Sequence, residues 1–305
     1  MDKTYADTVR LLLAMAPEVF RSGPFALKGG TALNLFIHDM PRLSVDIDVV
    51  YTAWETPRDD ALREIAEANV ALAMRLEQKG LSVRTVSVED LGESKLLVER
   101  SGVQVKVETN HVFRGTVLPV EARSLAPNAS AMFSAELSLP TLAMDELYGS
   151  KLVAALDRQH PRDFFDVWRM NETVGLTNGI VECFVTYLAG HNRPIHEVLF
   201  PRPKDMKREF ESNFAGMTND PVELATLLDV RDRLFDELPR YLSDDQKVFL
   251  TGLVRGVPDW SLLACHHASE LPAIRWRIQN IEGFRSKRPE EFDRQAKALE
   301  ELLGG

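Results

Sequence analysis

The chain has only two cysteines, Cys183 and Cys265, and they lie far apart in the sequence. His266 and His267 follow Cys265, but adjacent side chains on a helix point apart, so this cluster does not suit a metal ion. Isolated thiols without metal-ligand spacing are typical of a protein kept in a reducing compartment. We therefore expect both cysteines to be reduced and incidental to the function.

Long apolar segments are missing as well. No apolar run reaches the roughly eighteen residues that a membrane-spanning helix needs, and the first residues do not have the pattern of a signal peptide. We therefore expect a cytoplasmic protein with no membrane partner. The length of 305 residues, 45% of them hydrophobic, is enough for one large or two ordinary domains.

The chain also lacks an excess of positive charge, because 36 Lys and Arg face 46 Asp and Glu, a net charge of −10. This balance argues against a protein that coats nucleic acid, and we expect no DNA contact from this chain. Two local basic clusters are candidate RNA contacts, with solvated helix faces as the simpler explanation. These are Arg193, Arg202, Lys204, Lys207 and Arg208, and Arg275, Arg277, Arg285, Lys287 and Arg288. The acidity equally favours a basic partner.

The most informative segment is a glycine turn followed by two aspartates. Leu43–Tyr51 alternates and carries the β-branched residues of a strand, so Asp46 and Asp48 point to the same face. Ser44 precedes Asp46 by two residues on that face. Two adjacent carboxylates repel one another unless a hard cation lies between them, and Mg²⁺ with substrate phosphates suits such a pair.

The turn itself reads Lys28-Gly29-Gly30-Thr31, and a short helix is expected over residues 31–38. The backbone N–H groups of Gly29, Gly30 and Thr31 would then lie at a helix N-terminus. Unpaired donors and the helix dipole favour a triphosphate there, and the missing Cβ atoms let it approach closely. The Thr31 hydroxyl would either contact the phosphate or cap the helix.

Residues 25–48 resemble the AbiEii/AbiGii toxin family, which includes the MenT toxins and belongs to the DNA-polymerase-β-like nucleotidyltransferases. The family pattern is Gly-Gly-Thr or Gly-Ser, then Asp-x-Asp. A later segment resembles the family's further motifs, namely a lysine on a helix, an aliphatic pair and an aspartate. Here these are Lys151, Ala155-Leu156 and Asp163, with Asp166 one turn later. The alternative for this segment alone is a solvated lysine and a helix-start pair.

A strictly alternating segment, Val103–Asn110, predicts another strand. Lys106, Glu108 and Asn110 share its polar face. The resemblance implies that Glu108 is a third carboxylate beside the Asp-x-Asp strand, whereas the alternative is a face that meets solvent.

The expected fold class is α+β. Residues 1–135 would form a nucleotidyltransferase domain of the polymerase-β type, with a mixed sheet and flanking helices. Residues 136–305 would form a mostly helical domain that contributes Lys151 and Asp163 to the cleft. The motifs that carry the resemblance cover just under half of the chain.

The resemblance implies a Mg²⁺-dependent transfer of a nucleotide from an NTP. Asp46 and Asp48 would hold the metal ion, with Glu108 as a further ligand or as the proton acceptor. Lys151 would pair with the triphosphate, and Asp163 would fix Lys151 or contact the nucleotide. The expected nucleotide-binding residues are Lys28, Gly29, Gly30, Thr31, Ser44, Lys151, Arg158 and Asp166.

The resemblance further implies a toxin of a toxin–antitoxin or phage-defence module, encoded beside an antitoxin. The expected acceptor is the 3′ end of tRNA, whose modification would block translation. Three alternatives stay open: transfer to a protein or small molecule, a non-catalytic module that keeps the fold, and a metal-dependent phosphohydrolase. The motifs do not identify the base of the NTP.

Overall fold

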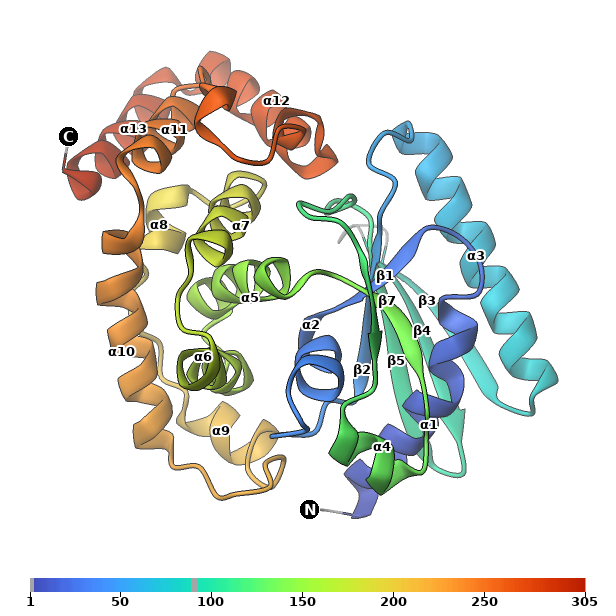
Figure 1. The fold of residues 1–305 in the computed structure, drawn as a ribbon. Helices are drawn as coiled ribbons and strands as arrows, with labels where there is room; N and C mark the ends of the chain where they lie inside the picture. Colours follow the sequence, from blue (N-terminus) through green and yellow to red (C-terminus); the bar gives the residue numbers. More distant parts are fainter. Residues whose placement is uncertain (1–2, 89–92, 305) are drawn as a thin grey trace. The chain divides into compact units, whose positions relative to one another are not determined.

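The computed structural model describes residues 3–88 and 93–304, which form two compact units. The first unit extends to Leu147 and also includes Ala215–Pro221, and the second comprises Tyr148–Phe214 and the chain from Val222 onward. Figure 1 shows a sheet with helices in the first unit and helices alone in the second. Among the described residues, no helix is long and apolar enough to span a lipid bilayer.

The first unit is built on a seven-stranded mixed sheet with the order β3-β4-β5-β2-β1-β7-β6. The pairs β2–β5 and β1–β7 are parallel, and the other neighbours are antiparallel. The strands are β1 (Phe25–Lys28), β2 (Asp46–Tyr51), β3 (Ser82–Val88), β4 (Glu93–Arg100), β5 (Val103–Asn110), β6 (Glu121–Ser124) and β7 (Ser138–Thr141).

Two long helices, α1 (Lys3–Val19) and α3 (Arg58–Gln78), pack on one face of this sheet. Ile47 and Val49 of β2 are fully buried, whereas Asp46 and Asp48 are partly exposed, as expected for side chains that alternate between two faces. The short helix α2 (Gly29–Ala32) lies on the other side of β2 and continues as a π-helical turn, Leu33–Ile37 (Figure 1). The remaining helix of this unit is α4 (Pro127–Phe133).

The second unit is helical. The boundary between the units lies inside α5 (Met144–Arg158), most of which belongs to the second unit. The helices that follow are α6 (Pro161–Thr173), α7 (Asn178–Ala189), α8 (Ile195–Leu199), α9 (Lys207–Asn213), α10 (Leu224–Tyr241), α11 (Asp244–Val254), α12 (Pro272–Lys287) and α13 (Pro289–Leu303). Sequence signals set several of these starts. Pro161 opens α6, where its missing N–H costs nothing, and Ser243 with Gln246 forms a capping box on α11.

The α+β fold class is confirmed, while three boundaries differ from those expected. The strand expected from Leu43 begins at Asp46, so Ser44 precedes it, and the helix expected from Thr31 begins at Gly29. The first unit extends beyond the expected end at residue 135, because β7 pairs with the interior strand β1 and so belongs to the sheet.

Candidate active site

The glycine turn lies between β1 and α2, directly beside the aspartate strand. Gly29 has a φ of +73°, and a Cβ atom placed on it would overlap the Asp48 carboxylate. A Cβ on Gly30 would lie 2.8 Å from Nη2 of Arg42 and 3.0 Å from Oγ of Ser44. Gly29 is therefore favoured by its backbone conformation and by contacts, whereas Gly30 is favoured by contacts alone. The N–H groups of both lie in the first turn of α2.

The sheet register places six charged residues in neighbouring positions on one face. Asp48 lies opposite Lys28 of β1 and opposite Glu108 of β5, while Asp46 lies opposite Lys106. Lys95 of β4 lies opposite Glu108 on the far side. Three carboxylates and three lysines thus form one patch. The sequence pattern indicated which side chains share a face within one strand, but not which strands lie next to one another.

Each carboxylate oxygen of Glu108 forms an ion pair with a lysine. Its Oε1 is 2.7 Å from Nζ of Lys95, and its Oε2 is 3.3 Å from Nζ of Lys106. Lys106 Nζ is also 3.9 Å from Oδ2 of Asp46. Burial alone would raise the pKa of Glu108, but the hydrogen bond from Lys95 and the charge of Lys106 outweigh burial and hold that pKa below its usual range.

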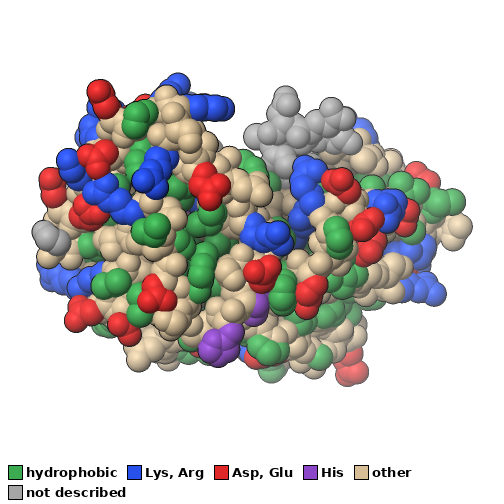
Figure 2. All heavy atoms as spheres, turned by 90° about the horizontal axis from the view of Figure 1, so that it is seen from above, with side chains coloured by type: hydrophobic (Ala, Val, Ile, Leu, Met, Phe, Trp, Pro, Cys, Tyr) green, Lys and Arg blue, Asp and Glu red, His purple; other side chains and the backbone are tan. Residues whose placement is uncertain are grey.

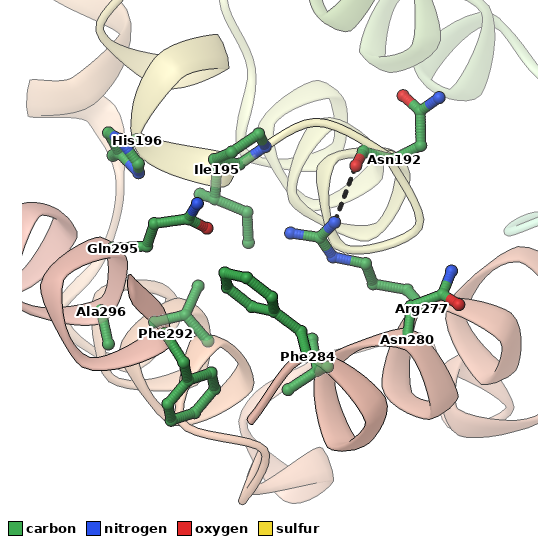
Figure 3. A pocket seen from close by; sticks show the side chains of 12 residues that line it. Asn192, Ile195, His196, Arg277, Asn280, Phe284, Phe292, Gln295 and Ala296 are labelled. Atoms are coloured by element: carbon green, nitrogen blue, oxygen red, sulfur yellow. Dashed lines mark hydrogen bonds between the residues drawn. The ribbon is translucent and has the colours of Figure 1, made fainter. Parts of the chain in front are cut away.

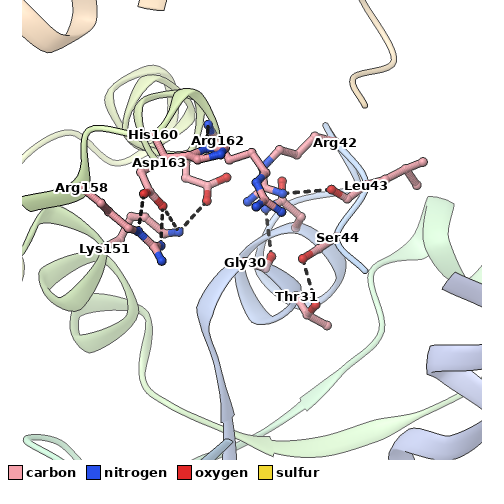
Figure 4. A network of polar contacts seen from close by, with 12 residues as sticks. Gly30, Thr31, Arg42, Leu43, Ser44, Lys151, Arg158, His160, Arg162 and Asp163 are labelled. Carbon is pink, nitrogen blue, oxygen red and sulfur yellow. Dashed lines mark hydrogen bonds and ion pairs between the residues drawn. The ribbon is translucent and has the colours of Figure 1, made fainter. Parts of the chain in front are cut away.

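The Thr31 hydroxyl links α2 to the start of the aspartate strand. It hydrogen-bonds with the Ser44 hydroxyl at 2.9 Å and with the main-chain carbonyl of Asp46. Thr31 and Ser44 are both buried. Thr31 is not the cap of α2, which begins two residues earlier. Its hydroxyl instead fixes the glycine turn against Ser44 (Figure 4) and against the main chain of Asp46.

A segment from late in the chain holds the connection between α2 and β2. The main chain of Leu43 bonds to the carbonyl of Met217 at 2.8 Å, and Asn219 donates from its side chain to the carbonyl of Met40 at 2.8 Å. Arg42 is buried beside Gly30 and donates to the carbonyl of Leu43. Nothing in the sequence of Ala215–Pro221 indicates this role, because it depends on contacts between residues far apart along the chain.

The later motif residues form a buried cluster on α5 and α6 of the second unit. Nζ of Lys151 lies 2.9 Å from Oδ1 of Asp163 and 3.0 Å from Oδ2 of Asp166, and Nε of Arg158 lies 2.8 Å from Oδ2 of Asp163 (Figure 4). Lys151 and both aspartates are almost fully buried, so the alternative of a solvated lysine does not hold. Burial opposes ionisation of Asp163, but the charges of Lys151 and Arg158 outweigh it and hold the pKa of Asp163 well below its usual range.

The Asp46–Asp48 pair is the part of the first unit that suits a cation. Among the described residues, no group of three or more His, Cys, Asp and Glu is placed to hold a metal ion by itself. Mg²⁺ is commonly bound by one or two carboxylates together with substrate phosphates and water. Two aspartates beside a turn of two glycines, which have no Cβ atoms, fit this combination of protein and substrate ligands.

A sequence model described as the nucleotidyl transferase AbiEii toxin of a type IV toxin–antitoxin system matches residues 10–280. The chain belongs to the AbiEii nucleotidyltransferase toxin family. Among solved structures, this AbiEii protein is similar to MenT4, a nucleotidyltransferase toxin from Mycobacterium tuberculosis H37Rv, with a TM-score of 0.59 and 17% identity. That match covers 92% of this chain and 94% of MenT4, and it shows the shared fold. A comparison with curated proteins gave no match.

The contact between Gly29 and Asp48 leads to a first prediction. Gly29→Ala should lose more stability than Gly80→Ala, although both glycines have similar positive φ values, +73° and +78°. Left-handed strain costs an alanine about 1–2 kcal/mol at either position. Only Gly29→Ala must also displace the Asp48 carboxylate, since a Cβ on Gly80 meets no atom within 4 Å.

Urea unfolding of both variants, with calorimetric titration of an NTP and Mg²⁺, measures this difference. We expect Gly80→Ala to bind the NTP as the parent protein does and Gly29→Ala to bind it much more weakly. Equal stability and equal NTP binding in the two variants would show that Gly29 is needed for its backbone conformation alone.

Proposed function

We propose that this AbiEii protein is a Mg²⁺-dependent nucleotidyltransferase that moves a nucleoside monophosphate from an NTP to the 3′ end of tRNA. The observation that carries the proposal is the placement of Asp46 and Asp48 beside the glycine turn, where the overlap of a Gly29 Cβ with Asp48 shows how closely the two approach. Backbone N–H groups of the kind that bind phosphate and carboxylates of the kind that bind metal ions thus lie side by side in one unit. The acceptor and the metal follow from the family resemblance and are proposals.

The reaction joins the 3′ oxygen of the acceptor to the α-phosphorus and breaks the bond to the β-phosphate, so pyrophosphate leaves. Asp46 and Asp48 would hold Mg²⁺, which neutralises charge that develops on the phosphates. The first N–H groups of α2 would bind phosphate oxygens. No side chain at Gly29 or Gly30 blocks that approach.

Glu108 is better suited to holding lysines than to accepting a proton. A general base works best when its pKa lies near the working pH, and the pKa of Glu108 lies below even its usual range. Its contacts fix Lys106 near Asp46, where the lysine can pair with a phosphate oxygen. A role for Glu108 as a further metal ligand requires that both lysines turn away.

In the second unit, the structure supports the part of the proposal in which Asp163 fixes Lys151. Pairing of Lys151 with the triphosphate, and nucleotide contacts by Arg158 and Asp166, remain predictions from the family resemblance. The same resemblance supports a cognate antitoxin as partner and action in the cytoplasm, where tRNA is available.

The test is incubation of the purified protein with total tRNA, Mg²⁺ and each α-labelled NTP in turn, with and without EDTA. We expect label on tRNA with one or few NTPs and none with EDTA or with the double variant Asp46→Ala/Asp48→Ala. Label on protein or on a small cationic compound would replace tRNA as the acceptor and keep the enzyme class. Release of free nucleotide without transfer would indicate a phosphohydrolase, and no turnover at all would indicate a non-catalytic module.

A further inference from the structure

The helical unit contains a pocket of about 230 Å³ between α12, α13 and the segment around α8 (Figure 3). Its walls are mainly apolar, and Phe284 of α12 points into its middle. Polar side chains stand around the apolar wall, namely Arg277, Asn280, His196 and Gln295. None of these residues belongs to the candidate active site.

Arg277 brings a positive charge to the lining of this pocket. Its Nη1 donates to the main-chain carbonyl of Asn192 at 2.8 Å, and its Nε is buried without a hydrogen-bond partner. Among the described residues, no carboxylate lies within ion-pair distance of Arg277, and burial lowers the pKa of its guanidinium. Arg277 is half-buried, and a partly desolvated cation without a counter-charge carries a cost that a bound anion would reduce.

The neighbouring face of α12 carries an exposed aromatic side chain among further cations. Trp276 is 45% exposed, which is unusual for so large an apolar side chain. Arg275 lies 3.6 Å from Glu270, and Arg285 lies over the Phe292 ring. Cations interleaved with an accessible aromatic ring are the combination that binds unstacked nucleotides.

The other basic cluster, around Arg193, differs in this respect. Arg193 is paired with Asp157 and with Glu197, and Lys204 donates to the carbonyl of Asp157 at 2.7 Å. These cations stabilise the unit internally. Figure 2, viewed from the side on which α12 lies in Figure 1, shows basic side chains interspersed with acidic ones, so any polyanion must be bound by a local feature.

We propose that α12 is an RNA-binding element whose pocket receives one unstacked nucleotide of the acceptor. Its base would pack against Phe284, its phosphate would pair with Arg277, and an adjacent base would stack on Trp276. The volume is below the range of about 300–1,000 Å³ that is usual for drug-sized ligands, which suits a single base. The inference deepens the proposed function and rests on RNA being the acceptor.

The experiment measures tRNA binding by the inactive double variant Asp46→Asn/Asp48→Asn, with labelled total tRNA over a series of salt concentrations. Trp276→Ala in this background should weaken binding about tenfold at an unchanged salt dependence, since stacking carries no charge. Arg277→Gln should weaken binding and reduce the slope of log K against log salt by about one. The matched control is Arg233→Gln, which removes an exposed arginine of α10. It should change neither the affinity for tRNA nor its salt dependence.

Trp276 is exposed, so its replacement leaves the packing of the unit in place and keeps the test decisive if Arg277→Gln unfolds. Variants that bind tRNA as the control does would overturn the inference, and so would a loss confined to binding of the cognate antitoxin. Nucleotide transfer is measured separately in the active protein. Transfer to tRNA with an unchanged KM in Trp276→Ala would overturn the inference and leave the proposed function. Binding of tRNA that depends on α12, without any transfer to tRNA, would overturn the proposed function and the assignment of the pocket to the acceptor, and would leave only RNA binding by α12.

Discussion

Replacing Asp46 or Asp48 by asparagine is expected to lower nucleotidyl transfer by about a thousandfold or more, because each loses a charge that would hold Mg²⁺. Such a factor corresponds to about 4 kcal/mol of transition-state stabilisation, within the several kcal/mol that a metal ion supplies to phosphoryl chemistry. The amide keeps the size of the carboxylate, so the close contact with the glycine turn stays in place. Initial rates with α-labelled NTP at saturating Mg²⁺ provide the measurement.

The matched control is Asp60→Asn, which removes a carboxylate of the same unit that pairs with Arg63 on the surface of α3. We expect this variant to keep the parent rate. Thermal unfolding should show that all three variants remain folded. Transfer rates near the parent value in both Asp46→Asn and Asp48→Asn would exclude the metal-binding role of these two aspartates.

Asp163→Asn is expected to lower the free energy of unfolding by about 3 kcal/mol or more, because removing one partner of a buried ion pair leaves the buried Lys151 ammonium with one carboxylate fewer. In this cluster Lys151 would keep only Asp166, while its ammonium group remains buried between α5 and α6. Urea unfolding of the variant at pH 7 gives the loss. Asp229→Asn on α10 is the control, since its pair with Arg233 is exposed and contributes little.

The stabilisation from the ion pairs of Asp163 depends on pH in a defined way. Lys151 and Arg158 outweigh burial and depress the pKa of Asp163, so its stabilising contribution is complete above the unfolded-state pKa of about 4. It is lost as the pH falls from there through the lower folded-state pKa. The stability difference between the parent protein and Asp163→Asn should therefore shrink on acidification below about pH 4. A difference that stays constant down to pH 2 would contradict this assignment.

Local sequence patterns predicted those features of the candidate site that depend on one strand or one turn. The alternation around Asp46 and Asp48 placed both carboxylates on one face, and the glycines predicted the start of a helix beside them. The alternation of Val103–Asn110 likewise predicted β5 with the observed bounds. These features follow from backbone geometry, in which strands repeat every second residue and glycine permits positive φ.

The tertiary structure alone decided which groups meet. The register of β4, β5 and β2 brings Lys95 and Lys106 to Glu108, and changes its role from an isolated carboxylate to the centre of an ion-pair network. The hydrogen bond from Leu43 to Met217 and the one from Arg277 to Asn192 likewise join residues that are distant in the chain. Periodicity reports the face on which a side chain lies, whereas its partners depend on the packing of whole elements, which no local pattern contains.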